Sequence, residues 1–181
     1  MNKSKLRSKI SRLRKFKFRE NLKINLEKIF QFLKYNKINV MSVGGYYPYN
    51  YEIDDLEILE KFRKKKIIVS LPIIKKNNQM DFFVWSKNNP LKINKYGIIE
   101  PTSKKKIYPD LILIPLLAYD IKLNRLGYGG GFYDRYIEKI EKKKKILKIG
   151  LAFSFQKVNR VPINEYDKKL DLIITEKNFI K

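Results

Sequence analysis

The chain has 181 residues with no cysteine and no histidine, so it cannot form disulfides, thiolate metal sites or imidazole ligands. Its chemistry therefore rests on carboxylates, lysine, arginine, tyrosine, the backbone and an oxygen-ligated cation such as Mg²⁺. The 41 lysine and arginine residues outnumber the 18 acidic residues, which gives a formal net charge of +23 and suggests a nucleic-acid partner. The lysines are spread along the whole chain beside abundant Asn, Ile, Tyr and Phe, however, and A- and T-rich coding explains this composition as well as a function does.

The first half of the chain alternates between helical and strand patterns. Apolar residues at helical spacing predict one or two basic amphipathic helices over residues 3–35, and the VMSV run at 40–43 predicts a strand. The segment 54–65 begins with acidic and ends with basic residues, as the helix dipole favours. Residues 66–74 (KIIVSLPII) predict a buried strand, and residues 80–85 (MDFFVW) predict a strand in a meander or at a sheet edge.

The second half continues the alternation. The segment GIIEP occupies residues 97–101, and the apolar run from Asp110 predicts a buried strand that ends at Pro115. A helix follows from Phe132, and strands are predicted at 146–154 and, as the last element, at 170–176.

This order predicts a single α/β domain, residues 1–181, with a largely parallel sheet flanked by helices on both faces. Ligand-binding loops of such sheets lie at the carboxyl ends of the strands, where residues 46–52, 71–76 and 118–134 are expected.

Four of the 8 glycines lie between positions 127 and 131, in the stretch NRLGYGGGFYDRY. A strand precedes this cluster and a helix follows it, an arrangement in which backbone N–H groups can bind an anion, most often phosphate. The spacing does not match a P-loop or a dinucleotide-binding fingerprint. The spacing alone also allows a tight connection without a ligand.

Segments along most of the chain resemble the 5-formyltetrahydrofolate cyclo-ligase family, also called 5,10-methenyltetrahydrofolate synthetases. The run DLILIPLLAYDIKLNRLGYGGGFYDRYI resembles the signature region of that family, and KSKLR resembles its N-terminal Lys-x-x-x-Arg element. The segments YYPYNYEID, GIIEP, IGLAFSFQ and VPINEYDKKLDLIITE resemble further family segments in the same order. Two residues depart from the family pattern: Leu116 follows the strand proline, and Leu123 stands ahead of the Asn-Arg pair, both where glycine is common. They put the path of this loop in doubt.

The resemblance implies an enzyme that uses ATP and Mg²⁺ to convert 5-formyltetrahydrofolate to 5,10-methenyltetrahydrofolate, with release of ADP and phosphate. Phosphorylation of the formyl oxygen would make it a leaving group, and N10 would then close the ring. Catalytic roles fall on Arg125 and Asp134, and metal binding falls on Asp134 and Asp171. The implied ATP-binding residues are Lys3, Arg7, Arg125, Leu126, Gly127, Tyr128, Gly129, Gly130, Gly131, Phe132 and Tyr133. The implied folate-binding residues are Tyr47, Glu52, Tyr128, Gly129, Gly130, Gly131 and Phe132.

Each assignment has a structural alternative. Asp134 could stabilise the start of its own helix, and Asp171 could cap a turn before its strand. Lys3 and Arg7 lie four residues apart, on one face of a helix, but lysine and arginine are most often solvated surface residues. Glu52 could be an ordinary residue at a helix entry. Core packing is the alternative for Tyr47 and the favoured interpretation for Tyr133 and Trp85.

Two rival functions follow from the same sequence. A basic nucleic-acid-binding α/β protein would bind with a steep salt dependence and without a saturable ATP site. A family member that binds folate without turnover would follow from the two leucines. We expect a cytoplasmic protein, because the basic N-terminus lacks a signal-peptide core. We also expect a monomer that acts on a small molecule and has no membrane or nucleic-acid partner. Whether the basic surface also attracts polyglutamylated folates or RNA is left open.

Overall fold

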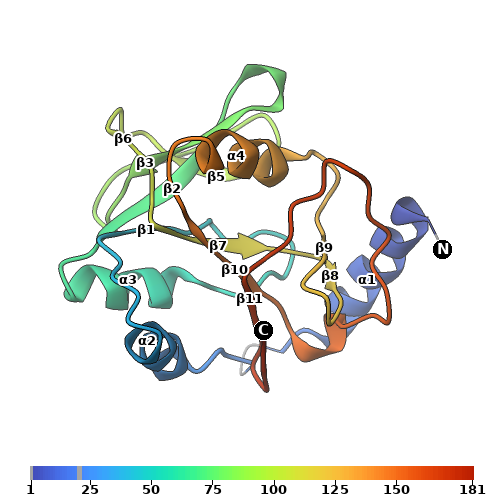
Figure 1. The fold of residues 1–181 in the computed structure, drawn as a ribbon. Coiled ribbons are helices and arrows are strands. Elements are labelled where there is room, and N and C mark those ends of the chain that lie inside the picture. The colour runs from blue at the N-terminus through green and yellow to red at the C-terminus, as the bar shows by residue number, and fades with distance from the viewer. Residues whose placement is uncertain (1, 20–21) are drawn as a thin grey trace.

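A computed structural model describes residues 2–19 and 22–181; the part of the predicted N-terminal helical region at residues 20–21 lies outside the described residues. The chain folds around an eight-stranded sheet of order β12-β11-β10-β7-β1-β2-β3-β6 (Figure 1). The parallel strands are β1 (Ser42–Gly44), β2 (Ile68–Ile74), β7 (Leu111–Pro115), β10 (Leu147–Leu151) and β11 (Leu172–Ile174). The antiparallel strands are β3 (Met80–Val84), β6 (Lys106–Ile107) and β12 (Phe179–Ile180).

Helices cover both faces of this sheet. One face packs against α2 (Leu26–Tyr35) and α3 (Leu56–Lys64), and the opposite face packs against α4 (Phe132–Glu141) (Figure 1). Strand β7 is a continuous apolar run because both of its faces are covered: Leu111, Leu113 and their neighbours alternate between the two cores. The predicted α/β fold, with a largely parallel sheet flanked by helices, is confirmed.

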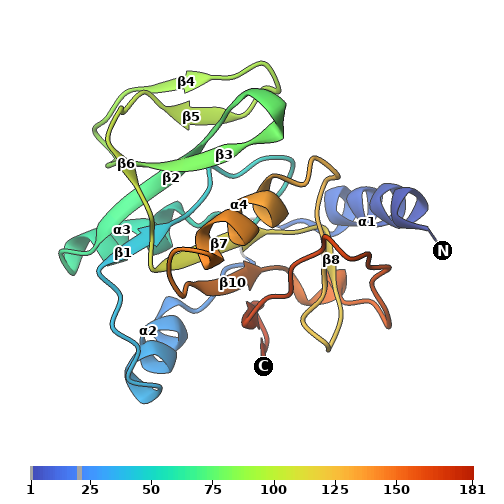
Figure 2. The same ribbon diagram turned by 45° about the horizontal axis from the view of Figure 1, so that its top comes forward.

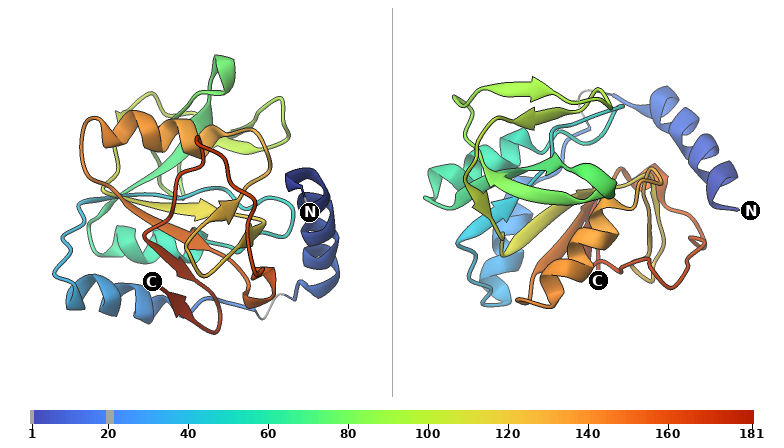
Figure 3. Two further views of the ribbon diagram at one scale, coloured as in Figure 1. Left: turned by 45° about the vertical axis from the view of Figure 1, so that its right-hand side comes forward. Right: turned by 90° about the horizontal axis from the view of Figure 1, so that it is seen from above.

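The N-terminal helix α1 (Lys3–Lys17) lies beyond the ends of the parallel strands and not on a face of the sheet (Figure 3). Its apolar side chains Leu6 and Ile10 form a small separate core with Leu117, Leu126 and Val161. This packing explains why the N-terminal region forms two helices: α1 contacts the strand ends and α2 contacts the sheet. Within the described part of the chain, no helix is long and apolar enough to cross a membrane.

Several short elements complete the fold. The hairpin of β4 (Leu91–Ile93) and β5 (Ile99–Pro101) lies beside β2 and β3 (Figure 2), and β8 (Ala118–Tyr119) pairs with β9 (Arg125–Leu126). Two 3₁₀ turns, η1 (Lys76–Asn78) and η2 (Ser154–Gln156), follow β2 and β10. The sequence placed the last strand at 170–176; the structure adds β12 after it, antiparallel to β11.

The two leucines that depart from the family pattern fit this structure. Leu116 is 1% exposed and joins the core beneath α4. Leu123 has a φ of 64°, in the left-handed region that favours glycine, so the position retains the backbone conformation of a glycine turn. The buried Asp120 accepts hydrogen bonds from the backbone of Lys122 and Asn124 and holds this loop closed. The β8–β9 hairpin therefore forms despite both substitutions.

Candidate active site

The glycine turn, residues 127–131, connects the β8–β9 hairpin to α4 at the carboxyl edge of the parallel strands. Gly129 has a φ of 105°, and Gly131, the N-cap of α4, has a φ of 65°. A Cβ atom at position 129 would lie 3.3 Å from the Arg7 guanidinium carbon. Because both positions need positive φ, the glycines present backbone N–H groups at a helix start, where an anion is favoured.

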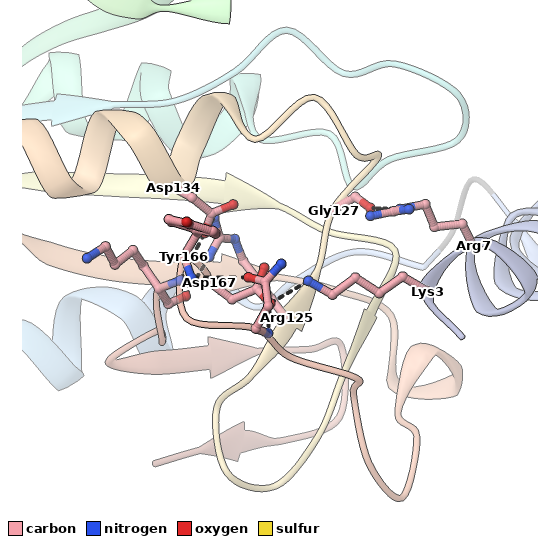
Figure 4. Close-up of polar contacts among 9 residues, drawn as sticks. Lys3, Arg7, Arg125, Gly127, Asp134, Tyr166 and Asp167 are labelled. Atoms are coloured by element: carbon pink, nitrogen blue, oxygen red, sulfur yellow. Dashed lines mark hydrogen bonds and ion pairs between the residues drawn. The ribbon is translucent and has the colours of Figure 1, made fainter. Parts of the chain in front are cut away.

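Basic side chains of α1 contact this turn and its surroundings (Figure 4). Arg7 Nε donates a hydrogen bond to the Gly127 carbonyl at 2.9 Å, although the two residues are 120 positions apart. Lys3 forms an ion pair with Asp167. The structure therefore brings Lys3 and Arg7, predicted to bind ATP, to the edge of the glycine turn.

Arg125 and Asp134 form a partly buried ion pair behind the turn (Figure 4). Arg125 Nη2 lies 2.9 Å from Asp134 Oδ1, and Nη1 donates to the Lys168 carbonyl at 2.6 Å. The Lys168 backbone N–H donates to the same Asp134 oxygen at 3.0 Å. This network fixes the segment after residue 163 against the start of α4, so that Asp167 lies close to the two predicted catalytic residues.

Asp167 and Lys168 are site residues that the sequence interpretation missed. Both lie in VPINEYDKKLD, four and three residues before Asp171, in the segment that resembles the end of the family pattern. An acidic residue in this segment was therefore visible in the sequence. Its contact with Lys3, 164 positions away, depends on the tertiary fold.

Asp171 lies elsewhere. It precedes β11, where its Oδ2 accepts the Lys148 backbone N–H at 2.8 Å and its Oδ1 lies 3.6 Å from Lys148 Nζ. The residue thus belongs to the amino edge of the parallel strands, whereas Asp134 and the glycine turn belong to the carboxyl edge. The structure does not bring Asp171 and Asp134 together.

Glu52 occupies a buried position beside the turn. It is 8% exposed, and its Oε2 accepts the Tyr49 backbone N–H at 2.9 Å. Burial raises the pKa of Glu52 to about 7, while the Tyr49 N–H, Arg14 and the Tyr128 hydroxyl act in the opposite direction. This carboxyl group therefore changes its protonation near neutral pH.

Other polar groups surround Glu52. Asp55 is fully buried, its Oδ2 accepts the Tyr46 backbone N–H at 3.0 Å, and its pKa is raised well above the ordinary value by burial. Asp55 Oδ1 and the Tyr133 hydroxyl are buried without hydrogen-bond partners in the described residues. Such unpaired polar atoms are rare in folded proteins, and Trp85 Nε1 and the Tyr136 hydroxyl are two more within the described residues. Tyr47 is half-buried and packs against the core under α2 and α3.

Two cavities flank the site. One, of about 190 Å³, lies between Glu52, Ile53, Phe18 and Phe153. The second, of about 310 Å³, lies at the β4–β5 hairpin, and its lining includes four lysines, Tyr96 and the buried Glu100. The Tyr96 ring meets the Phe132 ring edge-on at 6.0 Å, so the lysine-lined cavity adjoins the glycine turn. The four lysines are Lys75, Lys76, Lys92 and Lys95.

A magnesium ion fits the carboxylates near the turn when phosphate oxygens complete its shell. Among the described residues, no group of three acidic side chains could hold a metal alone. Mg²⁺ bound with nucleotide phosphates needs one or two carboxylates and keeps several waters. Asp134 and Asp167 each engage their basic neighbours through one oxygen, which leaves the second oxygen of each carboxylate for such a role. The arrangement thus combines a glycine turn at a helix start, two carboxylates and a buried titratable carboxyl group.

Comparisons with known proteins agree with this geometry. The model of the 5-formyltetrahydrofolate cyclo-ligase family matches residues 2–176. The 5-formyltetrahydrofolate cyclo-ligase of Haemophilus influenzae is 30% identical over 141 residues, 74% of this chain and 75% of that protein. The solved structure of Aquifex aeolicus 5,10-methenyltetrahydrofolate synthetase matches with a TM-score of 0.78 and 31% identity, over 99% of this chain and 92% of that chain. The Mycoplasma pneumoniae 5,10-methenyltetrahydrofolate synthetase matches with a TM-score of 0.71 and 26% identity, over 97% and 99%.

Proposed function

The chain belongs to the 5-formyltetrahydrofolate cyclo-ligase family, and from that premise we propose how its residues perform the family reaction. It is an enzyme that converts 5-formyltetrahydrofolate to 5,10-methenyltetrahydrofolate with ATP. The observation that carries our residue assignment is the meeting of three parts at one edge of the sheet: the glycine turn, the Arg125–Asp134 pair and the buried Glu52. We assign the first two to ATP and the third to the folate.

The chemical difficulty of the reaction is that an amide oxygen is a poor leaving group. Transfer of the γ-phosphoryl group from ATP to the formyl oxygen releases ADP and activates the formyl carbon. N10 then attacks this carbon and loses its proton, the carbon–oxygen bond breaks, and phosphate leaves. Phosphoryl transfer depends mainly on alignment and charge neutralisation, which this site can supply without histidine or cysteine.

The ATP phosphates bind to the backbone N–H groups of Gly127, Gly129, Gly130 and Gly131, with Leu126, Tyr128, Phe132 and Tyr133 forming the walls of the site. Arg7 and Lys3 offset phosphate charge from α1. Their present contacts support this role: Arg7 donates to the Gly127 carbonyl, and Lys3 pairs with the Asp167 carboxylate near the turn. Arg125 orients Asp134 through their 2.9 Å contact.

Mg²⁺, when bound, neutralises charge on the phosphate oxygens. Asp134 would hold it, directly or through water, with Asp167 as the neighbouring acid. The sequence suggested Asp171 as the second ligand; we assign that residue to the strand start, because Lys148 holds both of its oxygens.

Glu52 accepts hydrogen bonds from the N–H donors of the pterin ring. An ionised carboxylate accepts two hydrogen bonds from the adjacent N–H groups of a pterin ring, whereas a protonated carboxyl group accepts one. Tyr47 packs beside the ring, and Phe132 with the backbone of residues 128–131 closes the side nearest ATP. The lysine-lined cavity next to Phe132 suits an acidic tail, so we propose that polyglutamylated folates are also substrates. We further propose that residues 1–181 act as one domain, as a monomer, in the cytoplasm.

Isotope transfer tests the proposed route. With ¹⁸O in the formyl group of 5-formyltetrahydrofolate, the label should appear in the released phosphate, because the formyl oxygen leaves on phosphorus. Label in water with none in phosphate would contradict phosphorylation of the formyl oxygen. Omission of ATP serves as the control.

A further inference from the structure

Arg14 is a buried arginine to which neither the sequence nor the family comparison assigned a role. It is 1% exposed and is the largest of the fully buried side chains. It lies on α1 seven residues after Arg7, so two helical turns place Arg7 and Arg14 on the same face. Arginine is seldom fully buried unless its charge is paired. The position therefore calls for an explanation.

The contacts of Arg14 lead to the glycine turn. Its Nη2 donates a hydrogen bond to the Tyr128 hydroxyl, its guanidinium carbon lies 5.4 Å from the centre of the Tyr128 ring, and its Nη1 reaches the Leu116 carbonyl at 3.5 Å. Within residues 2–19 and 22–181, no carboxylate forms an ion pair with Arg14. Tyr128 is thus its main partner.

Arg14 and Tyr128 also act on Glu52: the Arg14 charge and the Tyr128 hydroxyl both lower the pKa of Glu52. Arg14 and Tyr128 therefore link α1 to the glycine turn, and both act on the carboxyl group that we assign to the pterin. The segment between β7 and β8 contributes the second contact of Arg14, the Leu116 carbonyl.

We propose that Arg14 is a positioning residue of the cyclo-ligase reaction: by holding the Tyr128 hydroxyl and the Leu116 carbonyl, it fixes the phosphate-binding turn relative to the folate. This inference rests on the proposed function of the site. A small shift of the turn would move the γ-phosphate away from the formyl oxygen. Rates of phosphoryl transfer depend steeply on this alignment.

The same residues act on the charge state of Glu52. The titratable and charged groups around Glu52 come from several elements: Arg14 from α1, Tyr46 after β1, Asp55 before α3, Tyr128 and Tyr133 from the glycine turn and α4, and Lys23, Asp54 and Glu57, which line the same cavity as Glu52. Arg14 is the cation that acts on Glu52 among them. Its removal leaves the effect of burial, which favours the protonated carboxyl group.

The test compares Arg14→Met, Arg14→Lys and Tyr128→Phe with a control, Arg12→Met, which removes an exposed arginine from the same helix. Binding of 5-formyltetrahydrofolate without ATP, measured by calorimetry from about pH 6 to about pH 9, should strengthen through the titration of Glu52. In Arg14→Met the midpoint of this titration should move to higher pH, while Arg14→Lys, which keeps the charge, should restore it. Arg12→Met should leave it unchanged.

Turnover gives the second readout. A hydrogen bond to a charged group corresponds to roughly tenfold or more in affinity or rate, so kcat should fall by about that factor in Arg14→Met and Tyr128→Phe. Arg14→Lys should restore the pH midpoint but not the full kcat, because lysine cannot reproduce the planar guanidinium contact.

An unchanged midpoint and unchanged kcat in folded Arg14→Met would overturn the inference. If that variant fails to fold, Tyr128→Phe decides, since it removes one hydroxyl and leaves Arg14 in place: normal kcat there would overturn the positioning role. Absence of turnover in the wild-type protein would instead count against the proposed function, and the binding titration would still test Arg14.

Discussion

Replacement of Glu52 by glutamine should make the protein more stable at alkaline pH while weakening folate binding. Glutamine keeps an oxygen that can accept the Tyr49 N–H, now at 2.9 Å, but it cannot ionise. The wild-type carboxyl group is 8% exposed, and burial raises its pKa from 4.5 to about 7.

The sign and size of the effect follow from this difference. Because the folded-state pKa is the higher one, the contribution of Glu52 to stability is fully present below about pH 4.5 and is lost as the pH rises through about 7. At about 1.4 kcal/mol for each pH unit, the ionised carboxyl group lowers the free energy of unfolding by about 3 kcal/mol above the folded-state pKa. Glu52→Gln should remove most of that loss.

Urea unfolding at about pH 5 and about pH 8 measures the effect. The stability of Glu52→Gln relative to wild type should increase between the two pH values by up to about 3 kcal/mol. The control is Glu138→Gln, an exposed residue of α4, for which the difference should stay within about 0.5 kcal/mol. A difference between Glu52→Gln and wild type that does not change with pH would refute the reasoning, because it would show that Glu52 does not titrate in this range.

Three further substitutions, two of them paired with a control substitution, test the phosphate side of the site. Gly129→Ala and Gly97→Ala both place alanine at positive φ, so both should destabilise by about 1–2 kcal/mol in urea unfolding. The kcat/KM for ATP should fall more than about tenfold in Gly129→Ala alone, because a Cβ at position 129 would lie 3.3 Å from Arg7, whereas a Cβ at position 97 would have no heavy atom within 4 Å. Asp134→Asn should reduce kcat by about a hundredfold or more with the fold retained, whereas Asp171→Asn should keep near-normal kcat. Equal losses of kcat in steady-state assays would contradict the separation of the two carboxylates. Arg125→Lys should also lower kcat, by about tenfold, because lysine cannot contact Asp134 and the Lys168 carbonyl together; an unaltered rate would show that this network is structural.

The sequence predicted the architecture well where local pattern decides it. The apolar run 111–114 is buried on both faces, as its composition indicates, and Pro115 ends it. The glycine cluster predicts a turn between a strand and a helix, and in the structure two of its residues, Gly129 and Gly131, have positive φ. Each of these features depends on residues close together in the chain.

Features that depend on tertiary contacts could not be predicted from the sequence. Arg14 is one of 41 basic residues, and its helical spacing does not distinguish it from solvated neighbours such as Arg12 until α1 is placed against the glycine turn. Asp167 meets Lys3 across 164 residues. Asp171 matched the family pattern by position, but the strand pairing of β10 and β11 places it beside Lys148. The pKa of Glu52 depends on burial that no local pattern measures.

The most direct test is absorbance in the 5,10-methenyltetrahydrofolate band after the purified protein is mixed with 5-formyltetrahydrofolate, ATP and Mg²⁺. We predict an increase that requires all three components, that matches the ADP released, and that is lost in Asp134→Asn. A folded wild-type protein that binds 5-formyltetrahydrofolate but gives no increase with all components present would contradict the account.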